Sequence, residues 1–353
     1  MSRLPHLLSP FEIKGLQLPN RLVMPPMCQY VAQEGVSQDW HFAHYAARAA
    51  GGVGLIIVEM TNVAPNGRIT PRCLGLWNDA QRDALRRIVD FAHACGSKIG
   101  IQIGHAGRKA QDCDDVVAPS ALPYGPPDFP GQRLKPPRAL ATAEVQALVQ
   151  AFADAVGRAV QAGFDLIELH GAHGYLIHQF YAPASNQRSD AYGQDRMLFG
   201  QQVVQAARAV MPAHMPLAVR ISAQEYSEGG FGLDYGLQVA RRFAAAGADL
   251  LHVSAGGNGR MAAGWHPPIV PGYQVEMARQ VKQATSLPVI AVGLLDAPEL
   301  AEHVLASGSA DLVAVGRALL RDPHWLLNAQ YRQPGQAAQE LQFVPAPYAR
   351  GFA

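Results

Sequence analysis

The sequence predicts a protein of the α/β class, built as one (β/α)8 TIM barrel. Short apolar runs rich in β-branched residues alternate with longer amphipathic stretches, and there are eight of these runs. Runs that are apolar on both faces and alternate with helices indicate a parallel sheet, and eight repeats favour its closure into a barrel. An open doubly wound sheet is the alternative, but its G-x-G-x-x-G fingerprint is absent after the first run.

The expected elements follow one another at regular intervals. The strands are expected at residues 21–27, 53–60, 98–104, 165–171, 216–222, 249–255, 288–293 and 311–316. The helices are expected at residues 39–50, 79–95, 142–162, 195–210, 234–246, 275–284, 297–306 and 323–330. The helix at 142–162 has the clearest pattern, because its apolar residues between Val145 and Val160 share one stripe. Gly163 then ends this helix and lets the chain turn into the next strand.

Three segments lie outside the repeat, within the single domain expected for residues 1–353. Residues 1–20 contain an alternating run around Gly15, which predicts a hairpin that plugs the bottom of the barrel. Residues 105–141 form a long loop after the third strand, rich in proline from Pro119 to Pro137, and predict a lid or substrate cover. Residues 334–353 have no periodic pattern and predict an extended C-terminal tail.

The composition excludes several classes of function. The 353 residues are 49% hydrophobic and carry a net charge of +1 without a Lys/Arg block, so neither nucleic acid nor an anionic membrane is an expected partner. The N-terminus lacks a signal-peptide core, and no apolar run reaches the roughly 18 residues of a membrane span. The four cysteines form no C-x-x-C pair, so we expect no metal cluster, reduced thiols and a cytoplasmic location.

Glycine and arginine follow the last strands of the predicted barrel. Functional groups of this fold lie at the C-terminal strand ends, and phosphate sites often use the loops after strands seven and eight. Gly293 and Gly316 would let backbone N–H groups approach phosphate oxygens, and Arg317 would add a charged contact. Ordinary helix caps and a surface arginine are the alternative interpretation.

Arg220 stands inside the apolar fifth strand. A buried charge must be paired or must meet a ligand. One interpretation is a structural ion pair with Glu168 or Glu59. The other is a cation that faces the electron-rich end of a flavin ring.

His170, His173 and Tyr175 form the densest polar cluster, at the end of the fourth strand. The pair of histidines lacks a third ligand, so a metal site is not expected. Core histidines that bond to the backbone are a second interpretation. The functional interpretation is two hydrogen-bond donors that polarise a carbonyl or nitro oxygen, with Tyr175 placed to deliver a proton.

Two residues after the first strand have both a structural and a functional interpretation. Cys28 is either a small buried hydrophobic residue or a contact at the edge of a flavin. Tyr30 either packs against its neighbours or bonds to a substrate.

These segments together resemble the old yellow enzymes. The matching motifs are Pro-Pro-Met-Cys-Gln-Tyr at 25–30, His-Ala-Gly-Arg-Lys at 105–109, His-Gly-Ala-His-Gly-Tyr-Leu-Ile-His-Gln-Phe at 170–180, Ser-Asn-Gln-Arg-Ser-Asp at 185–190, Val-Arg-Ile-Ser at 219–222, Glu-Tyr-Ser-Glu-Gly-Gly at 225–230 and Val-Gly-Arg at 315–317. They occur in order over nearly the whole chain. Cys28, Tyr30 and the Tyr-x-Arg-Gly tail are similar to the thermophilic-like branch, which includes bacterial NADPH dehydrogenases and xenobiotic reductases.

The resemblance implies a non-covalently bound FMN and NADPH or NADH as reductant. It implies flavin-binding roles for Pro25, Pro26, Met27, Cys28 and Met60 along the ring, for Gln102 and Arg220 at the pyrimidine, and for Gly293, Gly316 and Arg317 at the phosphate. Relatives often have Ala where this chain has Met60, a departure that bears on how the ring packs.

The resemblance also implies an ene-reductase that works by a ping-pong mechanism on α,β-unsaturated carbonyl or nitro compounds. His170 and His173 would bind the substrate oxygen and Tyr175 would donate a proton, with Tyr30 in contact with the substrate. A homodimer or homotetramer is implied, with Arg350 reaching the neighbouring site. Relatives often have Trp where this chain has Phe352.

Two other classes of function remain as alternatives. A flavin- or phosphate-binding barrel could act as a carrier or sensor without turnover. A barrel lyase or isomerase of phosphate esters would need a Schiff-base lysine or paired carboxylates, and Lys109, on a loop, is the nearby lysine.

Overall fold

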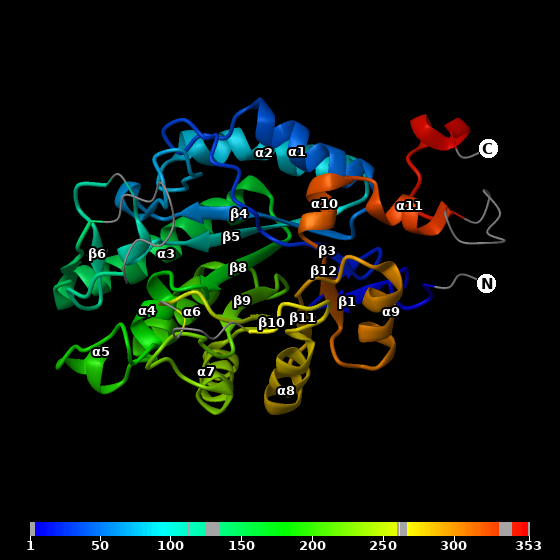
Figure 1. Cartoon of the computed structure of the whole chain (residues 1–353). Coiled ribbons are helices and arrows are strands. Elements are labelled where there is room, and N and C mark those ends of the chain that lie inside the picture. The colour runs from blue at the N-terminus through cyan, green and yellow to red at the C-terminus, as the bar shows by residue number, and fades with distance from the viewer. Residues whose placement is uncertain are drawn as a thin grey trace.

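The centre of the protein is a closed barrel of parallel strands (Figure 1), as predicted. The computed structural model describes residues 4–111, 113–124, 135–259, 261, 267–331 and 341–351. Around the barrel the strands are β3 (Leu22–Met24), β4 (Leu55–Asn62), β5 (Lys98–Gly104), β8 (Leu166–Gly171), β9 (Leu217–Ser222), β10 (Leu250–Ser254), β11 (Val289–Ala291) and β12 (Leu312–Ala314), and β12 closes onto β3. Each strand overlaps a predicted range, because strands buried on both faces leave a continuous apolar signal.

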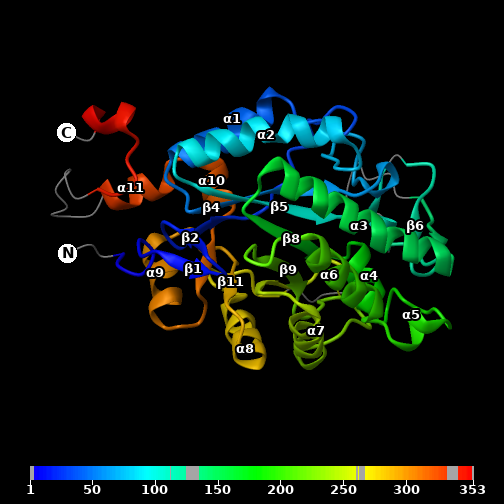
Figure 2. The same ribbon diagram turned by 180° about the vertical axis from the view of Figure 1, so that it is seen from behind.

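Helices surround the barrel on the outside (Figures 1 and 2). The longer ones are α1 (Asp39–Ala50), α2 (Asp79–Ala94), α3 (Thr142–Ala162), α6 (Leu198–Val210), α7 (Leu233–Ala246), α8 (Val275–Thr285), α9 (Pro298–Ala306) and α11 (Trp325–Tyr331). Helix α6 begins three residues later than predicted, because the Asp195 side chain accepts from the Met197 N–H and forms a turn first. None of the helices in the described ranges is long and apolar enough to cross a membrane.

Three short helices were not predicted: α4 (Leu176–Tyr181), α5 (Ala191–Gln194) and α10 (Arg317–Arg321). At four to six residues each, they are too short to show a helical repeat in the sequence. Both α4 and α10 follow barrel strands directly, so they shape the end of the barrel where the candidate site lies.

The predicted N-terminal hairpin is present and closes the bottom of the barrel. Strands β1 (Phe11–Ile13) and β2 (Leu16–Leu18) pair antiparallel. Ile13, Leu16 and Leu18 belong to one apolar cluster with side chains from the barrel strands, including Leu55 and Leu166. Burial of each large aliphatic side chain stabilises the fold by roughly 1.5–3 kcal/mol, so the hairpin is an integral part of the core.

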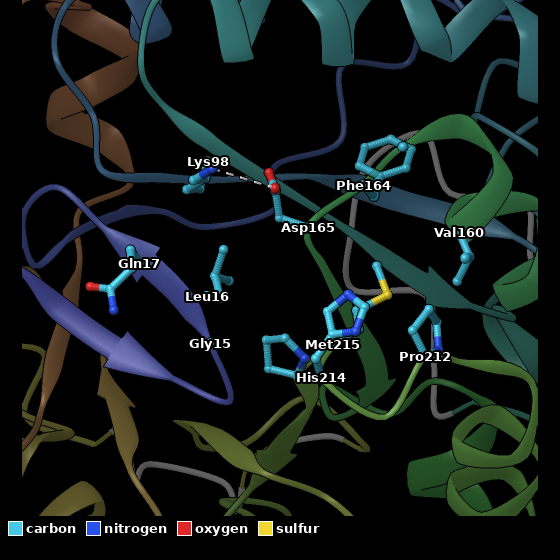
Figure 3. A pocket seen from close by; sticks show the side chains of 12 residues that line it. Gly15, Leu16, Gln17, Lys98, Val160, Phe164, Asp165, Pro212, His214 and Met215 are labelled. Atoms are coloured by element: carbon cyan, nitrogen blue, oxygen red, sulfur yellow. Dashed lines mark ion pairs between the residues drawn. The ribbon is translucent and has the colours of Figure 1, made fainter.

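A hollow of about 450 Å³ opens beside this hairpin (Figure 3). Leu16 lies on one side of it, with Val160 and Pro212 on the other, and Lys98 and Asp165 form an ion pair of 3.9 Å in its lining. Lys98 begins β5, and Asp165 stands immediately before β8. The hollow is therefore at the end of the barrel opposite to the candidate site.

The loop after β5 is anchored in its described parts. Strands β6 (Val117–Ala118) and β7 (Arg138–Ala139) pair in parallel. Arg138 Nε donates to Asp115 at 2.7 Å, and Arg188 Nη1 donates to the Pro119 carbonyl at 2.9 Å. The predicted lid thus has two fixed stems, while its positions 112 and 125–134 lie outside the described residues.

Candidate active site

The C-terminal ends of β9 to β12 surround a cavity of about 140 Å³. Its lining includes Arg220, Ser254, Gly293, Gly316 and Arg317. The structure therefore brings together the residues predicted for a phosphate site with the predicted flavin cation. Arg317 is exposed at the start of α10, whereas Gly293 is buried with a φ of +125°, a conformation that favours glycine.

Arg220 is buried, at 8% exposure, and forms no ion pair with any described residue. Its Nε is buried without a hydrogen-bond acceptor. Burial lowers the pKa of Arg220, and nearby Glu168 opposes that effect, yet a guanidinium stays protonated in proteins. A direct ion pair with Glu168 or Glu59, the structural interpretation, is not observed. Since an unpaired buried charge costs several kcal/mol, this cation fits an anionic or electron-rich ligand in the adjoining cavity.

Glu168 is held by two other side chains. Gln102 Nε2 donates to its Oε1 at 2.7 Å, and His252 Nδ1 donates to its Oε2 at 2.7 Å. Burial disfavours the carboxylate, but His252, Arg220 and Gln102 together bring the pKa of Glu168 below its usual range. One of the two amide N–H groups of Gln102 is used here, so its carbonyl oxygen and its second N–H are left for a ligand.

His170, His173 and Tyr175 lie together at the end of β8. The two imidazole ring centres are 5.2 Å apart, and the rings of His170 and Tyr175 are 4.8 Å apart. Burial and the charge of Arg220 lower the pKa of both histidines well below the usual range, so both rings are neutral at pH 7. The Ala172 N–H donates to His170 Nδ1 at 3.2 Å, which places the His170 proton on Nε2.

Lys109 supports this cluster from the loop after β5. Its Nζ donates to the backbone carbonyls of His173 at 2.9 Å and Gly257 at 3.1 Å, and lies 5.0 Å from the ring centre of Tyr175. Burial lowers the pKa of Lys109 to about 8. Burial also raises the pKa of the Tyr175 phenol well above its usual range, so this hydroxyl holds its proton. Two carbonyl contacts give Lys109 a structural role and do not favour the Schiff-base alternative.

The segment after β3 lies beside the cavity that contains Arg220 and beside the cluster that contains Tyr175. A Cβ added to Gly316 would lie 3.5 Å from Met27 Sδ and 3.6 Å from Pro25 Cγ, so this segment runs beside the cavity. Pro26 and Cys28 are half-buried, and Cys28 packs in one apolar cluster with Met60 and Tyr175. Burial, followed by the charge of Glu59, raises the pKa of the Cys28 thiol.

Tyr30 differs from its neighbours in this segment because it is 40% exposed. Its φ of +55° is a left-handed conformation that is uncommon for tyrosine. The side chain is thus partly open to solvent, and it also forms a hydrogen bond with the Cys28 side chain.

Met60 is accommodated by a glycine on the next strand. Met60 is buried at 1% exposure in β4. A Cβ added to Gly104 in β5 would lie 2.8 Å from Met60 Cγ and 3.2 Å from His170 Cβ. Met60 therefore fits in this position because Gly104 has no side chain, and Met60 and His170 lie on either side of Gly104.

The buried carboxylate of Glu59 supports the segment after β3 and was not predicted to do so. Glu59 Oε2 accepts the Gln29 N–H at 2.9 Å, and Oε1 lies 3.4 Å from the Tyr45 hydroxyl and 3.4 Å from His41 Nε2. His41 is neutral at pH 7, because burial lowers its pKa to about 4. No lysine or arginine in the described part of the chain forms an ion pair with Glu59, and burial raises the pKa of Glu59 to about 7.

Arg350 is not part of the site of its own chain. It lies in an exposed 3-10 helix, η4 (Ala346–Gly351), where the Tyr348 and His324 ring centres are 5.7 Å apart. Figures 1 and 2 place this segment beside α11, at the end of the molecule away from α4 and β6. Phe352 lies outside the described residues.

Comparisons with known proteins agree with this geometry. Residues 6–336 match the NADH:flavin oxidoreductase / NADH oxidase family. The chain is 40% identical over 351 residues to an NADPH dehydrogenase of Listeria innocua serovar 6a, covering 98% of this chain and 99% of that one. Morphinone reductase in complex with tetrahydroNAD has a TM-score of 0.78 at 29% identity, covering 92% of this chain and 91% of that one.

A more distant likeness concerns the fold alone. A 2-naphthoyl-CoA reductase complex gives a TM-score of 0.83 at 22% identity, and the match covers 91% of this chain but 51% of that one. This chain thus spans about half the length of that protein.

The barrel and the family match together define a class of protein, the flavin-dependent barrel oxidoreductases. The chain belongs to the NADH:flavin oxidoreductase / NADH oxidase family, which is the old yellow enzyme family. The resemblance found in the sequence is therefore confirmed.

Proposed function

We propose that the protein is an FMN-dependent ene-reductase of the NADPH dehydrogenase type. FMN, when bound, would supply hydride transfer from NADPH or NADH to the β-carbon of an electron-poor alkene, in two ping-pong half-reactions. The observation that carries the proposal is the neutral pair His170 and His173, which lies beside Tyr175 and next to the unpaired cation Arg220. Relatives named NADPH dehydrogenase, and morphinone reductase in complex with tetrahydroNAD, support the nicotinamide reductant.

The residues around the cavity would hold the cofactor without a covalent bond. Arg220 would supply positive charge at the pyrimidine, and the free carbonyl of Gln102 would accept a hydrogen bond there. The remaining flavin contacts would be the phosphate residues Gly293, Gly316 and Arg317, and the ring residues Pro25, Pro26, Met27, Cys28 and Met60.

His170 and His173 would donate hydrogen bonds to the carbonyl or nitro oxygen of the substrate. Negative charge grows on that oxygen as hydride reaches the β-carbon, so donors fixed in advance favour the transition state over the ground state. The Tyr175 hydroxyl, which burial keeps protonated, would supply the proton for the α-carbon. Tyr30, which is 40% exposed, would contact the substrate.

Arg350 would act in a neighbouring subunit of a homodimer or homotetramer. Its exposed helix η4 lies away from the site of its own chain, and this position supports a contact across an interface. The four cysteines are free thiols, which supports a reducing, cytoplasmic compartment. Sedimentation of the purified enzyme as a monomer would contradict the shared site.

An anaerobic spectral experiment tests the function directly. We expect the purified, FMN-supplemented protein to be yellow, to lose its colour with NADPH under argon, and to regain it when 2-cyclohexenone is added. A carrier or sensor would stay yellow with NADPH. A lyase or isomerase would have no yellow colour at all, and either result would contradict the proposal.

Replacement of Arg220 by methionine separates cofactor binding from folding. We expect the affinity for FMN to fall by about 10- to 100-fold, because a hydrogen bond to a charged group contributes roughly 1.5–3 kcal/mol. The apoprotein should lose little stability, because the substitution removes a buried charge that forms no ion pair, and this gain offsets the loss of the charge that favours the Glu168 carboxylate. Fluorescence titration of FMN and denaturant unfolding of the apoprotein measure the two effects. A strongly destabilised apoprotein with unchanged FMN affinity would show that Arg220 is structural.

Replacement of Tyr175 by phenylalanine tests the proton donor. The loss in the oxidative half-reaction should stay below the roughly 10²-fold that a fully required general acid contributes, because water can deliver the proton instead. Stopped-flow mixing of reduced enzyme with 2-cyclohexenone measures this rate. A loss confined to the reductive half-reaction with NADPH would argue against the assignment.

A further inference from the structure

Ser254 contacts one of the two candidate oxygen donors. It ends β10 and is buried at 4% exposure, and its Oγ lies 2.8 Å from Nε2 of His173. No other hydrogen bond of this hydroxyl occurs in the described part of the chain. Ser254 also lines the cavity that contains Arg220. Ser254 lies near the end of the strand expected at residues 249–255.

The contact matters because a neutral imidazole has one donor nitrogen and one acceptor nitrogen. If Ser254 donates to Nε2, the proton of His173 is on Nδ1, and Nδ1–H is free to bond to a substrate oxygen. If Nε2–H donates to Ser254 instead, Nδ1 carries only a lone pair, which repels such an oxygen. The direction of one hydrogen bond therefore decides whether His173 is a donor toward the substrate.

The surroundings of Ser254 favour donation to His173. In the opposite arrangement the hydroxyl hydrogen of Ser254 would have no acceptor among the described residues, and an unpaired buried donor is unfavourable. Arg220 lines the same cavity as Ser254. Its positive charge attracts the lone pairs of the Ser254 oxygen toward the cavity, which favours the arrangement in which the Ser254 hydroxyl hydrogen points to His173. Both effects act in the same direction.

We propose that Ser254 is a positioning residue that keeps the proton of His173 on Nδ1. The consequence for catalysis rests on the proposed role of His170 and His173 as oxygen donors. His170 has the opposite tautomer, because its Nδ1 accepts the Ala172 N–H and its Nε2 is protonated. The two rings, whose planes are 88° apart, would thus present Nε2–H and Nδ1–H to one oxygen.

The test compares Ser254→Ala with Ser254→Thr, which keeps the hydroxyl, at equal FMN occupancy. In holoenzyme labelled with ¹⁵N-histidine, we expect the His173 signals to report a protonated Nδ1 in wild type and in Ser254→Thr. In Ser254→Ala we expect a shift toward the form protonated on Nε2. A His173→Gln variant assigns the signals. A protein that merely lost packing would not change tautomer in this way.

Binding of a phenol provides the second readout, because its oxygen resembles the anionic oxygen of the substrate. Titration of 4-hydroxybenzaldehyde against the flavin spectrum should show affinity weakened by about 10- to 100-fold in Ser254→Ala and restored in Ser254→Thr. Protonation of Nε2 in wild type, or of Nδ1 in Ser254→Ala, overturns the proposal. If wild type is protonated on Nδ1 yet neither binds the phenol nor reduces enones, the role of Ser254 is supported and the proposed function fails.

Discussion

Replacement of both His170 and His173 by alanine is expected to lower kcat/KM for 2-cyclohexenone by at least about 10³-fold while FMN stays bound. Removal of one preorganised donor to a developing oxyanion typically costs 10²–10³ in rate. The combined effect should be smaller than the product of the single effects, because both donors act on one oxygen. Neither histidine lines the cavity that contains Arg220, Gly293 and Gly316, so the cofactor should be retained.

The oxidative half-reaction isolates this effect. Enzyme reduced with dithionite and mixed with 2-cyclohexenone in a stopped-flow instrument reports the rate of flavin reoxidation without any contribution from the nicotinamide. His214→Ala is a matched control, since it removes an imidazole from the hollow at the opposite end of the barrel and should leave the rate unchanged. Unchanged reoxidation in the double variant, with FMN bound, would refute the role assigned to the two histidines.

Much of the barrel could be predicted from the sequence, because its strands and long helices leave local signals. A strand such as β9 is apolar along its whole length, and helix α3 repeats its apolar stripe over 21 residues. Helices α4 and α10 could not be predicted, because elements of six and five residues depend on the packing around them. The N-terminal hairpin was predicted because its alternation of buried and exposed residues is itself local.

The candidate site also contains residues that could be predicted from the sequence and residues that could not. His170, His173 and Tyr175 form a cluster in the sequence and were predicted, whereas the partners of these residues come from distant segments. Ser254 meets His173 only because β10 lies two strands from β8 across β9 in the closed barrel. Glu168 meets His252 for the same reason.

One signal for these partners was present in the sequence. Polar residues alternate within the apolar strands, as Glu168 and His170 do in β8 and His252 and Ser254 do in β10. Because alternate residues of a strand face the same side, this pattern indicates polar side chains inside the barrel. It does not indicate which of them meet, since that depends on the register between strands.

Replacement of Glu59 by glutamine is expected to stabilise the protein at pH 8 by up to about 3 kcal/mol. Burial raises the pKa of Glu59 to about 7 in the folded state, against the usual 4.5. Each unit of difference corresponds to 1.36 kcal/mol. For an acid with a raised pKa, the stabilising contribution is fully present below pH 4.5 and is lost as the pH rises through about 7. Glutamine resembles the protonated acid and retains an acceptor for the Gln29 N–H. The stability of the Glu59→Gln protein should therefore not fall as the pH rises through about 7.

Glu168→Gln is the matched control, because the same substitution should have the opposite sign there. The pKa of Glu168 is lowered in the folded state by His252, Arg220 and Gln102 despite its burial, so its stabilising contribution is present above the unfolded pKa and is lost in acid. Denaturant unfolding at pH 5.5 and pH 8, with FMN at equal saturation, compares the two variants. A Glu59→Gln protein less stable than wild type at pH 8 would show that the ionised carboxylate is favourable in the fold. In that case the hydrogen bond from the Gln29 N–H to the Glu59 carboxylate would contribute more to stability than the loss of hydration of the carboxylate costs.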